Sequence, residues 1–317
     1  MRHSGELAAL LTAIFWTITA LAFEAASKKI GSLIVNLLRL LVGFFFLSIF
    51  AWIYRGYLLP VDASGRTWLI LVLSGLVGFT FGDLCLFQSF VVVGARISML
   101  LMALAPPMAA LISWIILGEQ MTPKSWLGMI ITITGITLVV LRREESPRKP
   151  EGRRKFRFSY PLWGILLGLG GAFGQSLGLV LSKLGMRSTA LDTAGQISSI
   201  AQNYNPFASA QIRVIAGITG FAILFTILGK WRDTWKAISN HKAVFQLSIG
   251  AFFGPFLGVS FSLLAVQLTN TGIASTIMAI VPVLIIPPSI FLFKEKVTLK
   301  EILGAILAVS GVALFFL

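Results

Sequence analysis

The sequence predicts an all-α, polytopic membrane protein with ten transmembrane helices, arranged as two inverted five-helix repeats. Three features predict this fold class: an apolar composition, ten long apolar segments and an internal repeat. Of the 317 residues, 56% are apolar and 12% are charged, whereas soluble domains are about 45–50% apolar and about 25% charged. Because a chain of this length cannot bury so much apolar surface in water, the composition excludes a soluble enzyme. It also excludes a disulfide scaffold, since Cys85 is the single cysteine.

Ten segments each hold the roughly 20 mostly apolar residues that a helix needs to cross the hydrocarbon core. The first five, within a predicted first repeat over residues 1–142, are 6–26, 33–54, 68–91, 95–117 and 125–141. The last five, within a predicted second repeat over residues 161–317, are 161–182, 206–228, 244–267, 271–293 and 299–316. Residues 143–160 between the repeats are rich in lysine, arginine and proline, which predicts a solvated linker.

The net charge of +14 is typical of the cytoplasmic loops of a membrane protein, where basic residues gather. Most of the basic residues lie in the linker and in the other loops that follow odd-numbered segments. The positive-inside rule places these loops in the cytoplasm and both termini outside. We therefore expect the lipid bilayer, and no nucleic acid, as a partner, and a multi-pass location in the cell (inner or plasma) membrane.

The two predicted repeats share a sequence pattern at a constant offset of 176 residues. Residues 78–138 align without a gap on residues 254–314, with identical residues at 15 of the 61 positions, including Pro, Glu, Lys and several Gly. Unrelated apolar helices share scattered Leu and Ile, but they seldom share these residue types in one register. Because each repeat has five spans, an odd number, the two repeats must insert in opposite orientations, as in many secondary transporters.

Small residues recur every four positions on the third and eighth spans. Gly78 and Gly82 lie on the third span, and their repeat mates Gly254 and Gly258 lie on the eighth. Such ridges let helix backbones approach closely, either as ordinary packing or as surfaces that slide during a conformational change.

Two prolines lie at matched positions in the middle of the fourth and ninth spans. Pro106 and Pro282 each remove a backbone hydrogen bond and are expected to kink their helices near the bilayer midplane. Matched breaks in inverted halves indicate the substrate site of a transporter. We expect Met102 and Met278, four residues before each proline, to contact the substrate with them.

Charged residues within the predicted spans are costly and need a partner or a function. Asp83 is the one acidic residue well inside a span, and it is a candidate for binding a cationic group or a coupled proton, or for pairing with Arg39 or Arg96. Arg39 and Arg213 lie near the starts of their spans, where a snorkelling, structural or gating role is expected.

Several polar or amphipathic side chains are candidates to face a central cavity. They are Trp16, Gln88, Gln175 and Ser176. Ser176 also completes a GxSxG pattern, residues 174–178, which raises the alternative of a membrane serine hydrolase. That chemistry needs a base beside the serine, and the two histidines, His3 and His241, lie outside the spans. We therefore expect no enzyme, no catalytic residues, no cofactor and no metal site, since neither a Walker motif nor a His/Cys cluster is present.

The chain resembles the drug/metabolite transporter superfamily, in particular its EamA-type transporters. The likeness rests on the ten spans and on an ordered set of short motifs: Phe15-Trp16-Thr17, Arg39, Pro106, Gly118-Glu119, Trp126-Leu127-Gly128, and the echoes Pro282, Glu295 and Leu303-Gly304. The resemblance implies a cavity lined mainly by spans 1, 3, 4, 6, 8 and 9, and gradient-driven movement of small metabolites. Two features depart from the family: Asp83 replaces an aromatic or apolar residue, and family members usually keep both termini in the cytoplasm.

The predicted function is that of a secondary transporter. We expect it to move a small polar, amino-acid-like metabolite by alternating access, as an exporter or facilitator. A lipid-carrier flippase of the same superfamily is the alternative within transport, and the serine hydrolase is the alternative from another class.

Overall fold

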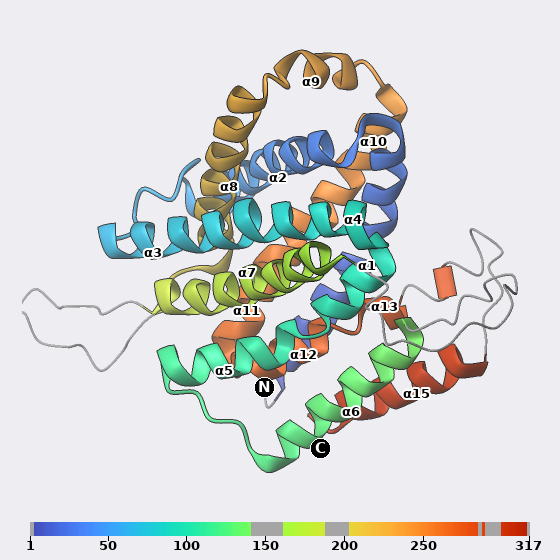
Figure 1. Ribbon diagram of the computed structural model, residues 1–317. Helices are drawn as coiled ribbons and strands as arrows, with labels where there is room; N and C mark the ends of the chain where they lie inside the picture. Colours follow the sequence, from blue (N-terminus) through green and yellow to red (C-terminus); the bar gives the residue numbers. More distant parts are fainter. Residues whose placement is uncertain (1–2, 141–160, 188–202, 285–286, 289–298, 316–317) are drawn as a thin grey trace, which may run out of the picture.

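A computed structural model describes residues 3–140, 161–187, 203–284, 287–288 and 299–315, so the whole of the predicted linker 143–160 lies outside the described residues. Helices account for nearly all of the described chain (Figure 1). In the first half these are α1 (Ser4–Ile30), α2 (Ser32–Arg55), α3 (Gly65–Gly75), the π-helix η1 (Leu76–Gly82), α4 (Asp83–Met102), α5 (Ala105–Leu117) and α6 (Pro123–Val140). In the second half they are α7 (Leu162–Met186), α8 (Pro206–Leu228), α9 (Trp231–Ile238), α10 (His241–Ala251), the π-helix η2 (Phe252–Gly258), α11 (Val259–Leu268), α12 (Thr271–Met278), α13 (Val281–Leu284) and α15 (Leu299–Ala313).

Six helices among the described residues are both long and apolar enough to cross a membrane. They cover Ser4–Ser27, Leu33–Arg55, Gly65–Leu86, Leu162–Met186, Pro206–Leu228 and His241–Leu268. The predicted spans 95–117 and 271–293 are not continuous helices, and the predicted spans 125–141 and 299–316 correspond to the shorter α6 and α15. Six of the ten predicted spans therefore meet the criterion of an uninterrupted long helix.

The outer surface of the bundle is apolar. Ile53, Ile115 and Ile227 are each about three-quarters exposed. Leaving such a side chain in water forgoes about 1.5–3 kcal/mol of transfer free energy, whereas lipid chains remove that penalty. The exposed isoleucines come from α2, α5 and α8, so lipid-compatible surface lies on both halves of the chain.

The helices break beside the two matched prolines. α4 runs through the predicted loop 92–94 and ends at Met102, and α5 then begins at Ala105 with Pro106 in its first turn. In the second half α12 ends at Met278 and α13 begins at Val281. Both interruptions fall at the same place at the 176-residue offset. The expectation of a kink within one helix is thus corrected to a break, because a proline is tolerated in a first helical turn but not in a helix interior.

A π-helix precedes the break in each half. η1 and η2 also occupy equivalent positions at the 176-residue offset. π-helical segments are rare and are frequent at functional sites. Pro255 is accommodated inside η2, where the altered hydrogen-bond register leaves room for its ring.

The predicted glycine ridges pack across the two halves. The ridge of Gly78 and Gly82 packs against α7. A Cβ on Gly174 of α7 would be 2.6 Å from the Gly82 Cα, and a Cβ on Gly178 would be 3.0 Å from the Gly78 Cα. Ser74 continues this ridge by donating its hydroxyl to the Gly178 carbonyl at 2.5 Å. The glycines at the contact therefore bring the backbones of the third span and α7 together.

The ridge of Gly254 and Gly258 packs against α1 in the equivalent way. A Cβ on Gly254 would be 2.8 Å from the Thr19 side chain, and a Cβ on Gly258 would be 2.7 Å from the Trp16 ring. The first helix of each half thus packs on the glycine ridge of the other half. The two contacts differ in that glycine meets glycine at α7, whereas larger side chains fill the space at α1.

α6 and α15 form an antiparallel pair at the edge of the bundle (Figure 1). A Cβ on Gly128 would be 3.0 Å from the Gly311 carbonyl oxygen, and a Cβ on Gly135 would be 2.6 Å from the Gly304 carbonyl oxygen. Rising numbers on α6 therefore meet falling numbers on α15. These four glycines are also the ones that the internal repeat matches, Gly128 with Gly304 and Gly135 with Gly311.

Candidate functional site

A cavity of about 330 Å³ lies at the centre of the bundle, within the range of small-molecule sites. Helices of both halves line it, and both helix breaks reach it through Ala103, Ala105, Ala279 and Val281. Ten of the residues singled out in the sequence line this cavity: Trp16, Arg39, Asp83, Met102, Pro106, Gln175, Ser176, Arg213, Gly254 and Met278.

The other predicted site residues lie elsewhere. Gln88 is exposed on α4 and does not line the cavity, because five helical residues turn it by about 140° from Asp83. Gly78, Gly82 and Gly258 lie behind the wall at the helix contacts. The side chain of Pro282 lies outside the described residues.

The cavity also contains residues that the sequence analysis did not single out. Thr19 lines it one helical turn after Trp16, and Phe79 and Pro255 line it from the two π-helices. Two signals were available: Thr19 shares a helix face with Trp16, and Phe79 and Pro255 are matched at the repeat offset. Ser262 and Ser275 contribute further hydroxyl groups, for which apolar spans give no comparable signal.

Asp83 is held in an ion pair inside the bundle. Its Oδ2 pairs with Nη2 of Arg39, and its Oδ1 accepts a hydrogen bond of 3.1 Å from Nε2 of Gln175. The side chains of Asp83 and Arg39 are only 6% and 15% exposed. Both carboxylate oxygens are thus engaged by the protein itself. Of the two roles weighed for Asp83, this geometry favours the pairing with Arg39.

Arg213 lies in the wall of the cavity without such a pair. It is 3% exposed, its Cζ lies 4.8 Å from the centre of the Phe79 ring, and among the described residues it makes no hydrogen bond or ion pair. Glycine makes this placement possible, because a Cβ on Gly78 would be 3.0 Å from Nη2 of Arg213. The expected snorkelling to the headgroups is therefore corrected: this guanidinium is turned into the protein.

The Ser176 hydroxyl is engaged with backbone. Its Oγ lies 2.7 Å from the Ala172 carbonyl and 2.8 Å from the Ala105 carbonyl, and the residue is 2% exposed. Neither His3 nor His241 lines the cavity. The hydroxyl thus ties α7 to the start of α5, beside the helix break, and neither histidine of the chain lies beside it as the base of a serine nucleophile would.

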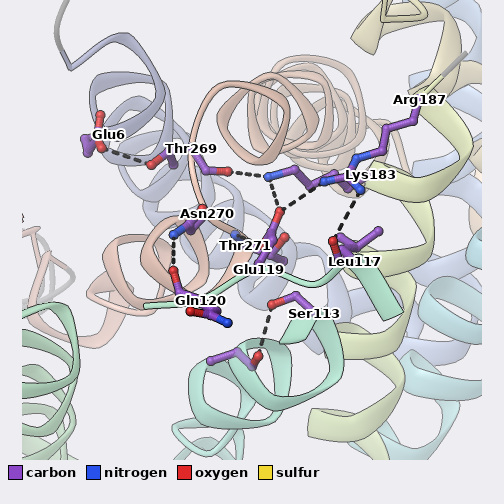
Figure 2. A network of polar contacts seen from close by, with 11 residues as sticks. Glu6, Ser113, Leu117, Glu119, Gln120, Lys183, Arg187, Thr269, Asn270 and Thr271 are labelled. Carbon is purple, nitrogen blue, oxygen red and sulfur yellow. Dashed lines mark hydrogen bonds and ion pairs between the residues drawn. The ribbon is translucent and has the colours of Figure 1, made fainter. Parts of the chain in front are cut away.

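A buried polar network joins the two halves at the end of the bundle where α5 and α7 end and α12 begins (Figure 2). Glu119 pairs with Lys183, with Oε1 and Nζ 2.5 Å apart, and these side chains are 6% and 10% exposed. The other Glu119 oxygen accepts a hydrogen bond of 2.8 Å from the backbone N–H of Thr271. Glu119 therefore caps the first turn of α12 while it neutralises a lysine on α7.

Further contacts extend this network to the first helix. Lys183 Nζ donates to the Thr269 carbonyl at 2.6 Å, and the Thr269 hydroxyl donates to Oε1 of Glu6 at 3.0 Å (Figure 2). Asn270 donates to the Gln120 carbonyl at 3.0 Å. Elements α1, α5, α7 and the α11–α12 turn are thus held together by charge-assisted hydrogen bonds at one end.

Tyr204 strengthens the same region from the segment before α8. Its backbone carbonyl accepts a hydrogen bond of 3.0 Å from Gln267, and its hydroxyl donates to Oδ1 of Asp62 at 3.1 Å. Burial raises the pKa of Tyr204 to about 12, so the phenol stays protonated and remains a donor at neutral pH.

Comparisons with known proteins agree with this architecture. One crystal structure superposes with a TM-score of 0.72 at 17% identity, covering 99% of this chain and 97% of that one. An uncharacterized transporter of a Sinorhizobium species is 29% identical over 142 residues, 44% of this chain and 99% of its own length. An uncharacterized membrane protein of Saccharomyces cerevisiae is 27% identical over 190 residues, 56% of this chain and 44% of its own length. The chain thus spans less than half of the yeast relative.

The family comparison covers almost the whole chain. The model of the EamA-like transporter family matches residues 3–141 and again residues 162–317. These two matches contain the helix breaks, both π-helices and every residue of the central cavity. The resemblance found in the short motifs of the sequence is thereby confirmed, and the chain belongs to the EamA-like transporter family of membrane transport proteins.

Proposed function

We propose that this protein is a secondary transporter of the cell membrane that moves a small polar metabolite by alternating access. In this proposal ten helices form two five-helix halves, residues 1–142 and 161–317, inserted in opposite orientations. The observation that carries the proposal is the central cavity, which both halves line at their matched helix breaks. Where a helix is broken at the centre of a bundle, backbone N–H and C=O groups are free to bind a ligand, and the helix segments can move relative to each other. Transporters use both properties at their substrate sites.

The antiparallel contact of α6 with α15 supports the inverted arrangement. If two mates of an internal repeat run in opposite directions, the operation that relates them turns one half over. The crossed glycine contacts, Gly128 with Gly311 and Gly135 with Gly304, are those that a twofold axis between the mates would produce. Such symmetry provides one fold with two related conformations, each open to a different side.

The polar network around Glu119 supports a closed gate at one end. It joins α5 of the first half to α7 and α12 of the second half through buried charges. Opening this end would require the Glu119–Lys183 pair to separate, while the glycine ridges allow α1 and α7 to slide on the opposite half. The cavity volume of about 330 Å³ fits a solute of amino-acid size, which favours a small metabolite over a lipid carrier.

Flux through the cavity tests the proposal. The full-length protein is reconstituted in liposomes and assayed for efflux of the metabolites that raise its thermal stability. Met102→Trp fills the cavity and should abolish the flux, because Met102 lines it. The matched control is Leu104→Trp, which adds the same bulk two residues away on a side chain that is 39% exposed. Flux that persists in Met102→Trp at the level of the control would contradict the proposal.

A further inference from the structure

The charges that line the central cavity do not balance. Among the described residues, its charged side chains are Arg39, Asp83 and Arg213. Asp83 forms its ion pair with Arg39 and also interacts electrostatically with Arg213, so two arginines share one carboxylate and one positive charge remains in excess. An uncompensated charge at this depth is strongly disfavoured, unless a ligand brings a counterion when it binds.

The surroundings of Arg213 suit a side chain that binds a ligand. Its Nε is buried without a hydrogen-bond partner, and its guanidinium is supported on one face by the Phe79 ring. Stacking on an aromatic ring orients a guanidinium while leaving its N–H edge free to bind a carboxylate through two parallel hydrogen bonds.

The internal repeat shows what is missing beside Arg213. Arg39 and Arg213 lie at similar places on the second span of each half, at an offset of 174 residues, and the counterpart of Asp83 at the 176-residue offset is Val259. Val259 lines the same cavity as an apolar side chain. In the first half Arg39 has Asp83 as its counterion, whereas the equivalent position of the second half holds the apolar Val259.

The rest of the wall is mainly apolar. Trp16, Leu40, Leu86, Leu179 and Val259 line it, together with the two methionines of the helix breaks. Such a surface suits the hydrocarbon or aromatic part of a ligand, with a few hydroxyl groups to orient it.

We propose that the substrate is a small organic monoanion, whose carboxylate pairs with Arg213 and whose apolar part packs against the cavity wall. This inference rests on the proposed transport function and names its substrate class. One negative charge makes the loaded cavity electrically neutral, so the occupied state carries no net charge through the low-dielectric centre of the bundle. A cation would instead add to the surplus positive charge.

A charge-sorted binding screen tests the substrate class. The purified full-length protein is screened by thermal shift against small carboxylates, their uncharged carboxamides and primary amines with the same apolar groups. N-acetylphenylalanine, N-acetylphenylalanine amide and phenylalanine amide form one such set. The proposal expects stabilisation by carboxylates, with affinities at least about tenfold above those of the matched amides and amines. If the stabilising compounds are amines or neutral amides, the anion inference is overturned while the transport proposal stands.

Two variants assign the effect to Arg213. Arg213→Gln should weaken binding of the stabilising carboxylate by at least about tenfold, whereas Arg213→Lys should retain part of it because the charge remains. The surface variant Arg232→Gln removes the same charge from the exposed face of α9 and should leave affinity unchanged. Unchanged affinity in folded Arg213→Gln would overturn the assignment.

A second pair of variants tests the missing counterion without touching the arginine. Val259→Asp places a second carboxylate in the cavity wall, which removes the surplus positive charge, and it should abolish carboxylate binding. Val259→Asn has nearly the same size and polarity without the charge, and it should bind carboxylates more tightly than Val259→Asp by about tenfold or more. Equal carboxylate affinities in these two variants would contradict the proposal. If no compound of any charge class binds the wild-type protein or is moved in liposomes, the transport proposal fails, and this inference fails with it.

Discussion

At the scale of single residues, the pair of Asp83 and Arg39 explains how a carboxylate survives inside the bundle. Each Asp83 oxygen has its own partner, Arg39 on one side and Gln175 on the other. A buried pair of this kind adds little net stability relative to apolar residues, but removing one member leaves the other charge unpaired. The pair therefore fixes where the charges lie, and it leaves Arg213 as the cation available to a ligand.

Replacing Asp83 by Asn should destabilise the protein by about 3–5 kcal/mol, because Arg39 becomes an unpaired buried charge. The double variant Asp83→Asn with Arg39→Gln should recover a large part of that loss, because neither charge remains. Thermal unfolding in detergent measures both. Asp233→Asn, which removes a carboxylate that is 50% exposed from its pair with Lys230, is the control and should shift stability by about 1 kcal/mol or less. A double variant no more stable than Asp83→Asn alone would contradict this account.

The sequence predicted more of the site's members than of their roles. Polar or proline residues in apolar spans indicated Trp16, Asp83, Pro106, Gln175 and Ser176, because such residues are costly in lipid. The orientation of Arg213 could not be predicted, since it depends on space left by a glycine of another helix. The prediction that Gln88 faces the cavity was wrong, because polarity alone does not say which face of a helix a side chain occupies.

At the scale of the elements, the glycine ridge between the third span and α7 sets how closely the halves approach. A Cβ on Gly174 would meet the backbone of Gly82, which cannot move aside as a side chain can. A Cβ on Gly170, one turn earlier, would meet Cys85 Sγ at 3.3 Å. The surroundings of Gly170 can therefore accept a methyl group more easily than those of Gly174.

Gly174→Ala should therefore lower stability by about 1–3 kcal/mol and reduce flux, because the two helices must separate to accept the methyl group. Gly170→Ala on the same helix is the matched control and should remain close to wild type. Thermal unfolding and liposome efflux provide the two measurements. The sliding role fails if Gly174→Ala unfolds earlier yet transports at the wild-type rate per folded molecule.

The network around Glu119 gives a second prediction about elements. Glu119→Gln removes the ion pair with Lys183 but keeps an oxygen that can accept from the Thr271 N–H. We expect this end of the bundle to open more often, so that hydrogen exchange of the peptide amides around 267–274 becomes at least several-fold faster. Asp233→Asn, which breaks the exposed pair with Lys230, is the control. Unchanged exchange in Glu119→Gln would show that the network is not the gate.

The helices themselves follow from the sequence, but their interruptions follow only in part. Apolar segments of about 20 residues mark where the chain can cross lipid, and six of the predicted spans are long unbroken helices. Pro106 and Pro282 predicted irregular helices at matched positions, although the structure has a helix break at each place rather than a kink. The π-helices were not predicted, because their extra residue reflects packing at the cavity rather than local propensity.

At the scale of the whole molecule, the repeat provides both the architecture and its asymmetry. The matched breaks, π-helices and glycine contacts give the two halves one design. The exception is the position where the first half has Asp83 and the second has Val259, and this difference gives the shared cavity its surplus positive charge. In the proposed account, the symmetry allows the cavity to open to two sides, and the departure from symmetry favours an anionic substrate.

Accessibility of the cavity from each side of the membrane tests this account most directly. Met102→Cys, in a Cys85→Ser background, places one thiol in the cavity wall. In oriented liposomes, a membrane-impermeant thiol reagent should label it from either side, and the stabilising carboxylate should slow labelling from both. Labelling from one side only, under all substrate conditions and also after Glu119→Gln, would contradict a cavity with alternating access.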